Sequence, residues 1–242
     1  MKNTLKAPKG FYYMYGKHTV LAALNNPKRI IKNILCNKEI FDTYKDIISN
    51  FSYKIVTNNE LTQLLGTGSV HQGIAANTQS IFLSDIRALD LSQNSCKIAI
   101  LDQVTDPQNI GAIIRSAASF NITAIILPHD NAPDENQAIA KTASGSLELV
   151  QVIKVTNLKS TIDYLKKHGF WIMGLDGYAE QPLTNKIFSD KMAIILGSED
   201  KGIRRLVKEA CDHLVKIPIS AKVESLNVSN AAAIVFYLVN EG

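Results

Sequence analysis

From Lys97 onward the chain alternates short apolar runs with longer amphipathic runs, and this alternation limits the choice of fold more than any other feature. The apolar runs are typical of buried strands and span residues 97–101, 123–127, 150–155, 171–174 and 191–196. The amphipathic runs have helical spacing and span residues 110–120, 157–168 and 203–210, with one more from about Asp134. Strands that alternate with helices form mostly parallel sheets with both faces covered. We therefore predict an α/β fold for this part of the chain.

Polar loops follow strands of this predicted sheet at residues 102–109, 197–202 and 220–229. Because ligands of open α/β sheets bind beyond the carboxyl ends of the strands, these three loops are candidates for a common site. The third loop alternates hydrogen-bonding side chains with apolar ones, which is how a small-molecule pocket is lined. We expect Pro218 to end the strand before this loop, and Ser229 or Asn227 to cap the helix after it. The alternative is an ordinary loop before a capped, buried helix.

Two of these loops carry residues suited to binding an anion or a nucleotide. Gly111 and Arg115 are four residues apart on a predicted helix, so they share one face. A guanidinium so placed can grip a phosphate, although a surface ion pair would explain Arg115 equally well. Asn109 is expected to cap the same helix. In the next loop, Gly197 and Gly202 permit a tight turn and a close approach of a ligand to the backbone.

The first 80 residues predict a second, smaller unit in which helices and strands also alternate. Helices are expected at residues 18–25, 39–50 and 59–65, and strands at residues 31–37, 53–57 and 73–79. Asn58 or Asn59 is expected to cap the third helix. The pattern weakens after Phe82. We therefore predict an N-terminal domain at 10–82, a linker at 83–95 and a C-terminal domain at 96–242.

Charge is distributed unevenly between these two parts. Residues 1–83 hold ten Lys or Arg and four Asp or Glu, a net charge of +6, whereas the remainder carries −2 and the whole chain +4. A basic N-terminal part suggests a polyanionic partner, most simply RNA, although an idle basic surface is the alternative. The aromatic cluster from Phe11 to Tyr15 is suited to stacking on bases. We favour the simpler interpretation, that these rings pack on the first helix.

The three cysteines and the N-terminal residues indicate the compartment. Cys36, Cys96 and Cys211 are far apart and form no C-x-x-C pair, so we expect reduced, structural thiols and no metal site. The N-terminus lacks the apolar core of a signal peptide, and no run approaches the length of a membrane span. We therefore expect a cytoplasmic protein.

Together, the three loops resemble the ordered motifs of a known enzyme family. The motifs are Asn109-Ile-Gly-Ala-Ile-Ile-Arg115, Ile194-Ile-Leu-Gly-Ser-Glu-Asp-Lys-Gly202, and Ile217-Pro-Ile followed by Glu224-Ser-Leu-Asn-Val-Ser229. They resemble the motifs of the SpoU (TrmH-like) RNA 2′-O-ribose methyltransferases of the SPOUT superfamily, over residues 97–242. Residues 11–80 are similar to the family's small substrate-binding domain, which has a ribosomal-protein-like fold. The combination most resembles the branch that methylates guanosine in 23S ribosomal RNA.

The resemblance implies a fold, a cofactor and a set of site residues. The fold would be a mostly parallel sheet whose C-terminal stretch forms a trefoil knot, in a homodimer with active sites at the subunit interface. S-adenosylmethionine would contact Gly197, Ile217 and Leu226. The family's active-site positions fall on Asn109, Arg115, Glu199, Ser225 and Asn227. This chain departs from the family pattern in having Asp200 where a glycine is commoner and Asn230 where an apolar residue is usual.

The implied activity is S-adenosylmethionine-dependent methylation of a ribose 2′-oxygen, in a guanosine of 23S rRNA. A transfer RNA ribose methyltransferase and a non-catalytic RNA-binding assembly factor are the alternatives. The family's arginine, here Arg115, is described as the base that takes the hydroxyl proton. Since a guanidinium keeps its proton in proteins, we expect Arg115 to act first as a phosphate clamp that also stabilises developing negative charge.

Overall fold

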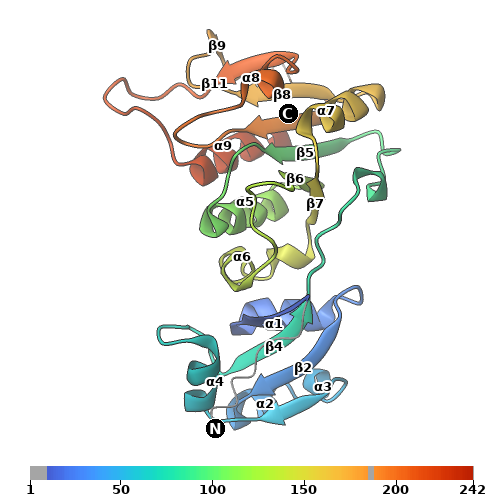
Figure 1. Ribbon diagram of the computed structural model, residues 1–242, viewed down its shortest axis with the longest axis vertical. Helices are drawn as coiled ribbons and strands as arrows, with labels where there is room; N and C mark the ends of the chain where they lie inside the picture. Colours follow the sequence, from blue (N-terminus) through green and yellow to red (C-terminus); the bar gives the residue numbers. More distant parts are fainter. Residues whose placement is uncertain (1–9, 185–187, 242) are drawn as a thin grey trace. The chain divides into compact units, whose positions relative to one another are not determined.

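The structure is a computed structural model that describes residues 10–184 and 188–241, and it divides into two compact units (Figure 1). Unit 1 comprises the chain up to Ile81 together with Asp134–Leu149, and unit 2 comprises Phe82–Pro133 and the chain from Val150. The segment 134–149 thus packs with the N-terminal residues, although the sequence places it inside the C-terminal domain.

Unit 1 is a four-stranded mixed sheet with helices. Its elements are β1 (Phe11–Tyr15), α1 (Lys17–Asn25), β2 (Ile31–Cys36), α2 (Lys38–Thr43), α3 (Lys45–Ile48), β3 (Tyr53–Ile55), α4 (Asn58–Leu65), β4 (Ile74–Gln79), α6 (Gln137–Ala143) and the short 3₁₀ helix η2 (Ser146–Glu148). The strand order is β1-β4-β2-β3, with only β2 and β3 running parallel. The predicted small α/β unit is confirmed, but the helix expected at 39–50 is two short helices.

The aromatic cluster near the N-terminus forms the edge strand β1, which the sequence analysis did not identify. Tyr13 and Tyr15 pack beside a buried cluster made of Leu35, Leu61 and Ala75. Leu61 belongs to α4, so these two rings pack toward α4, whereas the sequence analysis favoured packing on the first helix.

Residues 134–149 complete unit 1 through α6 and η2, which lie against α1, while α6 also lies against β1. The hydroxyl of Thr19 donates to the carbonyl oxygen of Ala140 at 3.4 Å. Gly145 has a φ of 91°, and a Cβ atom there would lie only 3.0 Å from the Cβ of Ala22. A glycine is therefore needed for this close contact with α1.

Unit 2 is a seven-stranded parallel sheet with helices on both faces. Its elements are η1 (Ile86–Ala88), β5 (Cys96–Leu101), α5 (Pro107–Ser119), β6 (Ala124–Pro128), β7 (Gln151–Val155), α7 (Leu158–Lys167), β8 (Trp171–Leu175), β9 (Gln181–Pro182), β10 (Lys191–Leu196), α8 (Arg205–Lys208), β11 (His213–Lys216) and α9 (Val228–Glu241). The strand order is β7-β6-β5-β10-β8-β11-β9, and every pair is parallel.

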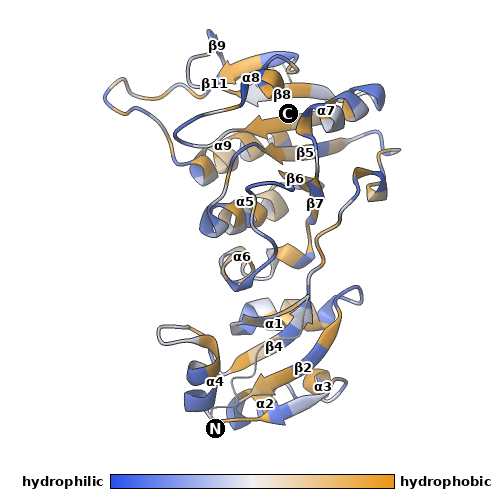
Figure 2. Ribbon diagram, viewed as in Figure 1, coloured by the Kyte–Doolittle hydropathy of each residue, from blue (hydrophilic) through white to orange (hydrophobic). Residues whose placement is uncertain are grey.

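The central strands of this sheet are buried on both faces, and Figure 2 colours β6 and β8 mainly as hydrophobic. On one face, alternate strand residues such as Ile100 and Ile195 form a core with Ile162 of α7. Helices α5 and α9 pack together and bury residues such as Ile113 and Phe236. The predicted parallel sheet with two covered faces is confirmed.

Several predicted boundaries in unit 2 are wrong. Helix α8 spans only residues 205–208, and β11 ends at Lys216, so Ile217 and Ile219 follow the strand without belonging to it. Helix α5 begins at Pro107, three residues before the predicted start. Of the helices that the structure describes, none combines the length and apolar character needed to cross a membrane.

The three cysteines have free thiols, as predicted. Cys36 and Cys96 are buried, and Cys211 is half-buried with its thiol donating to the carbonyl oxygen of Val207. Burial raises the pKa of the Cys211 thiol to about 12, which makes it unreactive at neutral pH.

Candidate active site

The three predicted loops leave the same edge of the parallel sheet. Leu196 at the end of β10 is level with Leu101 of β5 and with Leu175 of β8, which is in turn level with Val215 of β11. The segments that begin at residues 102, 197 and 217 therefore start at the same edge of the sheet, at the carboxyl ends of β5, β10 and β11, with β8 between the last two. Figure 1 shows the last of these segments as an extended loop between β11 and α9.

The side chain of Asn227 joins the three loops. Its Nδ2 donates to Oδ1 of Asn109 at 3.0 Å and to Oε1 of Glu199 at 2.7 Å. Its Oδ1 accepts from the backbone N–H and the hydroxyl of Ser229, which makes Asn227 the N-cap of α9. One amide therefore contacts predicted site residues that lie 118 and 28 positions away in the sequence.

Asn109 reaches this junction because it does not cap its own helix. The cap of α5 is Asp106, whose side chain accepts from the backbone N–H of Gln108 at 3.0 Å. Asn109 then lies in the first turn, with its amide oxygen available to Asn227. The prediction that Asn109 caps α5 is wrong. The error matters because capping by Asp106 leaves the Asn109 side chain free to accept a hydrogen bond from Asn227.

Glu199 contributes negative charge at the start of α9. Besides the bond from Asn227, its Oε1 accepts from the backbone N–H of Val228 at 3.2 Å. A carboxylate in this position is favoured by the partial positive charge of the helix N-terminus. The interaction holds the 197–202 loop against the beginning of the last helix.

Arg115 and Ser225 lie apart from this hydrogen-bonded junction. Arg115 is exposed on α5, and its guanidinium makes no hydrogen bond to any residue in the described ranges. Ser225 is also exposed, and its hydroxyl has no protein partner within residues 10–184 and 188–241. Gly111, four residues before Arg115, is buried. An exposed, uncommitted cation on the helix that carries Asn109 remains available to an anionic ligand.

The turn after β10 brings its own backbone into close contact. A Cβ atom on Gly197 would lie 2.2 Å from the carbonyl carbon of Gly202 and 2.5 Å from the backbone nitrogen of Ile203. The N–H of Gly202 also donates to the carbonyl oxygen of Ser198 at 2.9 Å. Gly197 is therefore required by the turn itself, independently of any ligand.

The loop between β11 and α9 and the carboxylate of Glu199 suit S-adenosylmethionine chemically. Ile217 and Leu226 are half-buried, and Ile219 and Val223 expose apolar side chains in the same loop. Apolar walls of this kind fit an adenine ring and methylene groups, and the exposed carboxylate of Glu199 suits a sulfonium cation.

The two departures from the family pattern both face solvent. Asp200 is exposed in the turn, and Asn230 is exposed on the first turn of α9. Because Asn230 is not packed in the core, a polar residue there does not disturb the packing of α9.

The sequence analysis did not single out a buried ion pair at the same edge. Asp102, the first residue after β5, is fully buried, and its two carboxylate oxygens accept from the backbone nitrogen of Arg204 at 2.8 Å and from its Nε at 2.7 Å. A carboxylate directly after an apolar strand was a signal for Asp102. Nothing in the local sequence indicates its pairing with Arg204, 102 positions away.

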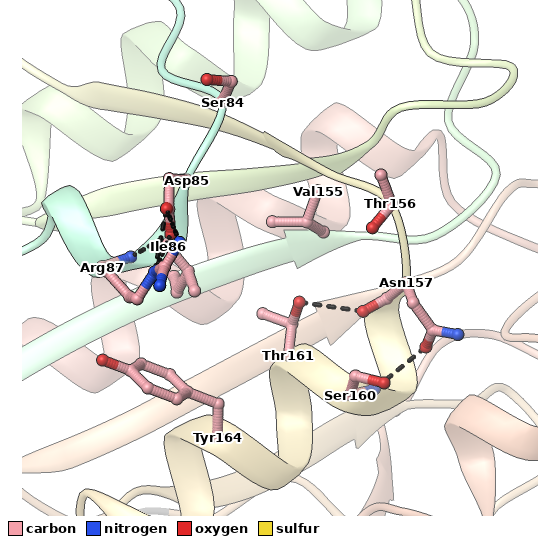
Figure 3. A pocket seen from close by; sticks show the side chains of 10 residues that line it. All are labelled: Ser84, Asp85, Ile86, Arg87, Val155, Thr156, Asn157, Ser160, Thr161 and Tyr164. Atoms are coloured by element: carbon pink, nitrogen blue, oxygen red, sulfur yellow. Dashed lines mark hydrogen bonds and ion pairs between the residues drawn. The ribbon is translucent and has the colours of Figure 1, made fainter.

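A hollow of about 450 Å³ elsewhere in unit 2 is lined by residues 84–87 and by side chains from Val155 to Tyr164 (Figure 3). None of the predicted site residues lines it. Its polar groups bond to one another: Arg87 to Asp85, the Thr161 hydroxyl to the carbonyl oxygen of Asn157, and the Ser160 N–H to the Asn157 side chain. These contacts form a local ion pair and the N-cap of α7.

Solved methyltransferases have the same fold as this chain. The structure is similar to the SpoU methyltransferase AviRb from Streptomyces viridochromogenes in complex with the cofactor AdoMet, with a TM-score of 0.82, 19% identity, and coverage of 96% of this chain and 90% of that one. It is also similar to the AdoMet-bound rRNA methyltransferase from Sinorhizobium meliloti, with a TM-score of 0.81, 18% identity, and coverage of 96% and 88%. At these identities the similarity establishes the fold.

Sequence comparison gives the family. The chain is 37% identical over 236 residues to the 23S rRNA (guanosine-2′-O-)-methyltransferase RlmB of Coxiella burnetii, with 93% of this chain and 94% of the relative covered. It is 36% identical over 234 residues to RlmB of Yersinia pestis, with 93% and 95% covered. Residues 13–81 match the RNA 2′-O ribose methyltransferase substrate-binding family, and residues 97–237 match the SpoU rRNA methylase family. The chain therefore belongs to the SpoU rRNA methylase family.

Proposed function

We propose that this chain methylates the 2′-oxygen of a guanosine ribose in 23S ribosomal RNA, with S-adenosylmethionine as the methyl donor. Two RlmB relatives, matched over more than nine-tenths of both chains, support this substrate. A substrate-binding family match over residues 13–81 supports RNA binding by the N-terminal part. The observation that carries the proposal is the junction of Asn109, Glu199 and Asn227, which joins three loops, together with the uncommitted guanidinium of Arg115 on the helix that carries Asn109.

When bound, S-adenosylmethionine would supply an electrophilic methyl group on a sulfonium; its transfer to the ribose would release a neutral thioether and, to solvent, the proton of the 2′-hydroxyl. The chain's main task is to align the two reactants, and such positioning can lower the barrier by up to ~7–11 kcal/mol. Arg115 grips a phosphate beside the target ribose and stabilises negative charge that develops on its 2′-oxygen. Asn109 orients the ribose or Arg115, and the Asn109–Asn227 bond keeps its amide in place.

We assign the remaining predicted site residues to binding. Gly197, Ile217 and Leu226 hold S-adenosylmethionine, and their half-buried position along the turn and the last loop supports this role. Ser225 contacts substrate, and Asn227 fixes the loop that carries it. Glu199 holds the second loop against α9.

We also propose that the chain forms a homodimer with its active sites at the subunit interface and that its C-terminal stretch forms a trefoil knot. The exposed side chains of Ile234 and Tyr237 on α9 support an interface. Contacts of α9 with Glu199 near its start and with Lys97 near its end support the threaded path. We propose that the protein acts in the cytoplasm, which the ribosomal RNA substrate of its relatives supports. We also propose an RNA-binding domain at 10–82 and a catalytic domain at 96–242, of which residues 134–149 pack with unit 1.

The test is an Arg115→Ala variant assayed with labelled S-adenosylmethionine and a 23S rRNA fragment. We expect it to lose nearly all methyl transfer while calorimetry shows unchanged cofactor binding. Arg87→Ala, which removes an exposed arginine that pairs with Asp85 outside the three loops, should retain wild-type activity. Loss of cofactor binding together with activity in Arg115→Ala would refute the role of Arg115 as a substrate clamp.

The substrate class needs a separate experiment. Mass spectrometry of rRNA and tRNA from cells that lack this chain should show one missing 2′-O-methylguanosine in 23S rRNA. A methyl group missing from tRNA instead would identify a transfer RNA methyltransferase. An unchanged methylation pattern, with no cofactor binding in calorimetry, would indicate a non-catalytic RNA-binding factor.

A further inference from the structure

The guanidinium of Arg204 is held on one side only. Its Nε and its backbone nitrogen both donate to Asp102, whose carboxylate is fully buried, whereas the Arg204 side chain is 49% exposed. No residue in the described part of the chain accepts a hydrogen bond from its terminal nitrogens Nη1 and Nη2. Four of the five guanidinium N–H groups therefore remain available.

The contacts with Asp102 fix the direction in which these groups point. An arginine side chain carries about 2 kcal/mol of rotamer entropy, which it loses when it is ordered on a ligand. Here the buried carboxylate orders Nε before any ligand binds, and the backbone bond fixes the start of the same side chain. A guanidinium prepared in this way can bind a planar or tetrahedral oxyanion at a lower entropic cost.

Arg204 lies at the same sheet edge as the proposed active site. It directly follows Ile203, whose backbone nitrogen would lie 2.5 Å from a Cβ atom on Gly197. The side chain of Gln103, next to Asp102, donates to the carbonyl oxygen of Gly202 at 3.4 Å. Asp102 and Arg204 thus fasten the base of the turn that carries Glu199.

The charged residues near Arg204 in the sequence carry both signs, since Glu199, Asp200 and Glu209 accompany Lys201, Arg205 and Lys208. Lys201 and Arg205 are exposed within three positions of Arg204, and Arg205 is paired with Glu209 at 2.6 Å. The ammonium group of Lys201, in contrast, has no hydrogen-bond or ion-pair partner among residues 10–184 and 188–241. The negative charge of Asp102 is already matched by Nε, so the outer edge of the guanidinium presents positive charge to solvent.

We propose that Arg204 binds a backbone phosphate of the RNA substrate beside the methylated nucleotide, and that Asp102 is the positioning residue that orients it. The proposal rests on the RNA substrate inferred above and adds a phosphate contact separate from Arg115. A guanidinium can form two parallel hydrogen bonds with a phosphate, which fixes the strand in register without reading its sequence.

The test measures binding of a 23S rRNA fragment at several salt concentrations. Arg204→Gln is expected to raise the RNA Kd roughly tenfold, as for the loss of a charged hydrogen bond. It should also reduce the slope of log Kd against log salt by about one, because one phosphate contact is lost. Cofactor binding, measured by calorimetry, should be unchanged. Arg205→Gln is the matched control and should leave both the Kd and the slope near wild type.

Two further variants separate contact from positioning. Asp102→Asn keeps the cation, so it should raise the RNA Kd while leaving the salt slope unchanged. Arg204→Lys retains one charge and a donor, so it should keep the slope with a smaller rise in Kd. If Arg204→Gln does not fold, an unchanged Kd in Arg204→Lys would overturn the proposal. Equal slopes for Arg204→Gln and wild type, or a parallel loss of cofactor binding, would overturn the proposal.

The outcome also distinguishes this proposal from the proposed function. If the wild-type chain methylates the fragment but Arg204→Gln keeps its KM and salt slope, only the assignment of Arg204 fails. If the wild-type chain neither binds nor methylates 23S rRNA fragments, both fail.

Discussion

Each unit contains one arginine held by a buried carboxylate, but the two sites satisfy their hydrogen bonds to different degrees. In unit 1, the Arg29 side chain is fully buried and bonds to Glu135 at 2.5 Å and to Glu148 at 2.5 Å. In unit 2, Arg204 bonds to Asp102 through Nε and leaves its terminal nitrogens facing solvent. The comparison indicates that an arginine–carboxylate pair stabilises the fold in unit 1, whereas in unit 2 it leaves an arginine that can bind a ligand.

The Arg29 cluster is complete within the chain. Besides the two glutamates, Arg29 donates to the carbonyl oxygen of Gln79 at 2.9 Å, and the Tyr12 hydroxyl donates to Glu135 at 2.6 Å. Burial and the charge of Glu135 raise the pKa of Tyr12 well above its ordinary value, so this hydroxyl remains a donor at any physiological pH. Since these bonds join residues 12, 29, 135 and 148, the cluster ties the segment 134–149 to the N-terminal sheet.

The largest expected effect on stability is that of Arg29→Met. Removing one partner leaves Glu135 and Glu148 buried without a counter-charge, which typically costs about 3–5 kcal/mol. Urea unfolding measures this loss. Arg204→Met should cost less, because the Arg204 side chain is only half-buried and its backbone N–H still donates to Asp102. Similar losses for the two variants would contradict the distinction between the units.

A smaller effect is expected for Asn227→Ala, which removes the N-cap of α9. Loss of a cap costs about 1 kcal/mol in free energy of unfolding, and this variant should also lose most methyl transfer because the three loops are no longer joined. Asn157→Ala is a matched control, since Asn157 caps α7 by accepting from Ser160 at 3.0 Å. It should lose similar stability and keep its activity. Equal losses of activity in the two variants would show that the loss of stability, and not the separation of the three loops, explains the effect.

Arg115→Ala should change stability least among the site variants. Its guanidinium is exposed and bonds to no described residue, so the free energy of unfolding should stay within about 0.5 kcal/mol of wild type. Denaturant titration of the variant used in the activity assay provides the measurement. A loss well above 1 kcal/mol would mean that Arg115 supports the fold, and its effect on catalysis would need another explanation.

The sequence predicted those features that depend on local patterns. Alternating apolar and amphipathic runs gave the parallel sheet, and polar loops after strands identified the edge at which Asn109, Glu199 and Asn227 meet. The convergence of these loops follows from a general rule, because parallel strands place their carboxyl ends together.

Helix starts were harder to predict because adjacent residues offer several caps. Helix α4 is capped by Thr57 and not by Asn58 or Asn59, in a capping box with Glu60. That box was visible in the sequence, as was Pro107 at the first position of α5, which indicates a cap one residue earlier. Both errors came from choosing the nearest asparagine.

Long-range pairs could not be predicted from the sequence alone. Arg29 meets Glu135 across 106 positions, and Asp102 meets Arg204 across 102. No periodicity or spacing rule connects residues so far apart, since their contact depends on the complete packing of each unit. For the same reason, the sequence placed residues 134–149 in the C-terminal domain.

A third pair, Asp85 with Arg87, extends the comparison to full exposure and gives the smallest expected effect. Hydrogen bonds from the Arg87 side chain and backbone lower the pKa of Asp85 to about 2. Any stability from this pair is therefore present above the ordinary value of 3.8 and lost as the pH falls through about 2. Because solvent screens both groups, we expect no measurable effect on unfolding at neutral pH.

NMR titration of the carboxyl groups in an Arg87→Ala variant tests whether the Arg87 side chain lowers the pKa of Asp85. The pKa of Asp85 should rise toward its ordinary value but remain below it, because the backbone N–H of residue 87 still donates to the carboxylate. Asp90 is an internal reference, since its pKa is lowered by Ser92 and should not move. If Asp85 keeps a pKa near 2 in the variant, its ionisation does not depend on the guanidinium. The Asp85–Arg87 pair could then not serve as the exposed reference against which the pairs of Arg204 and Arg29 are compared.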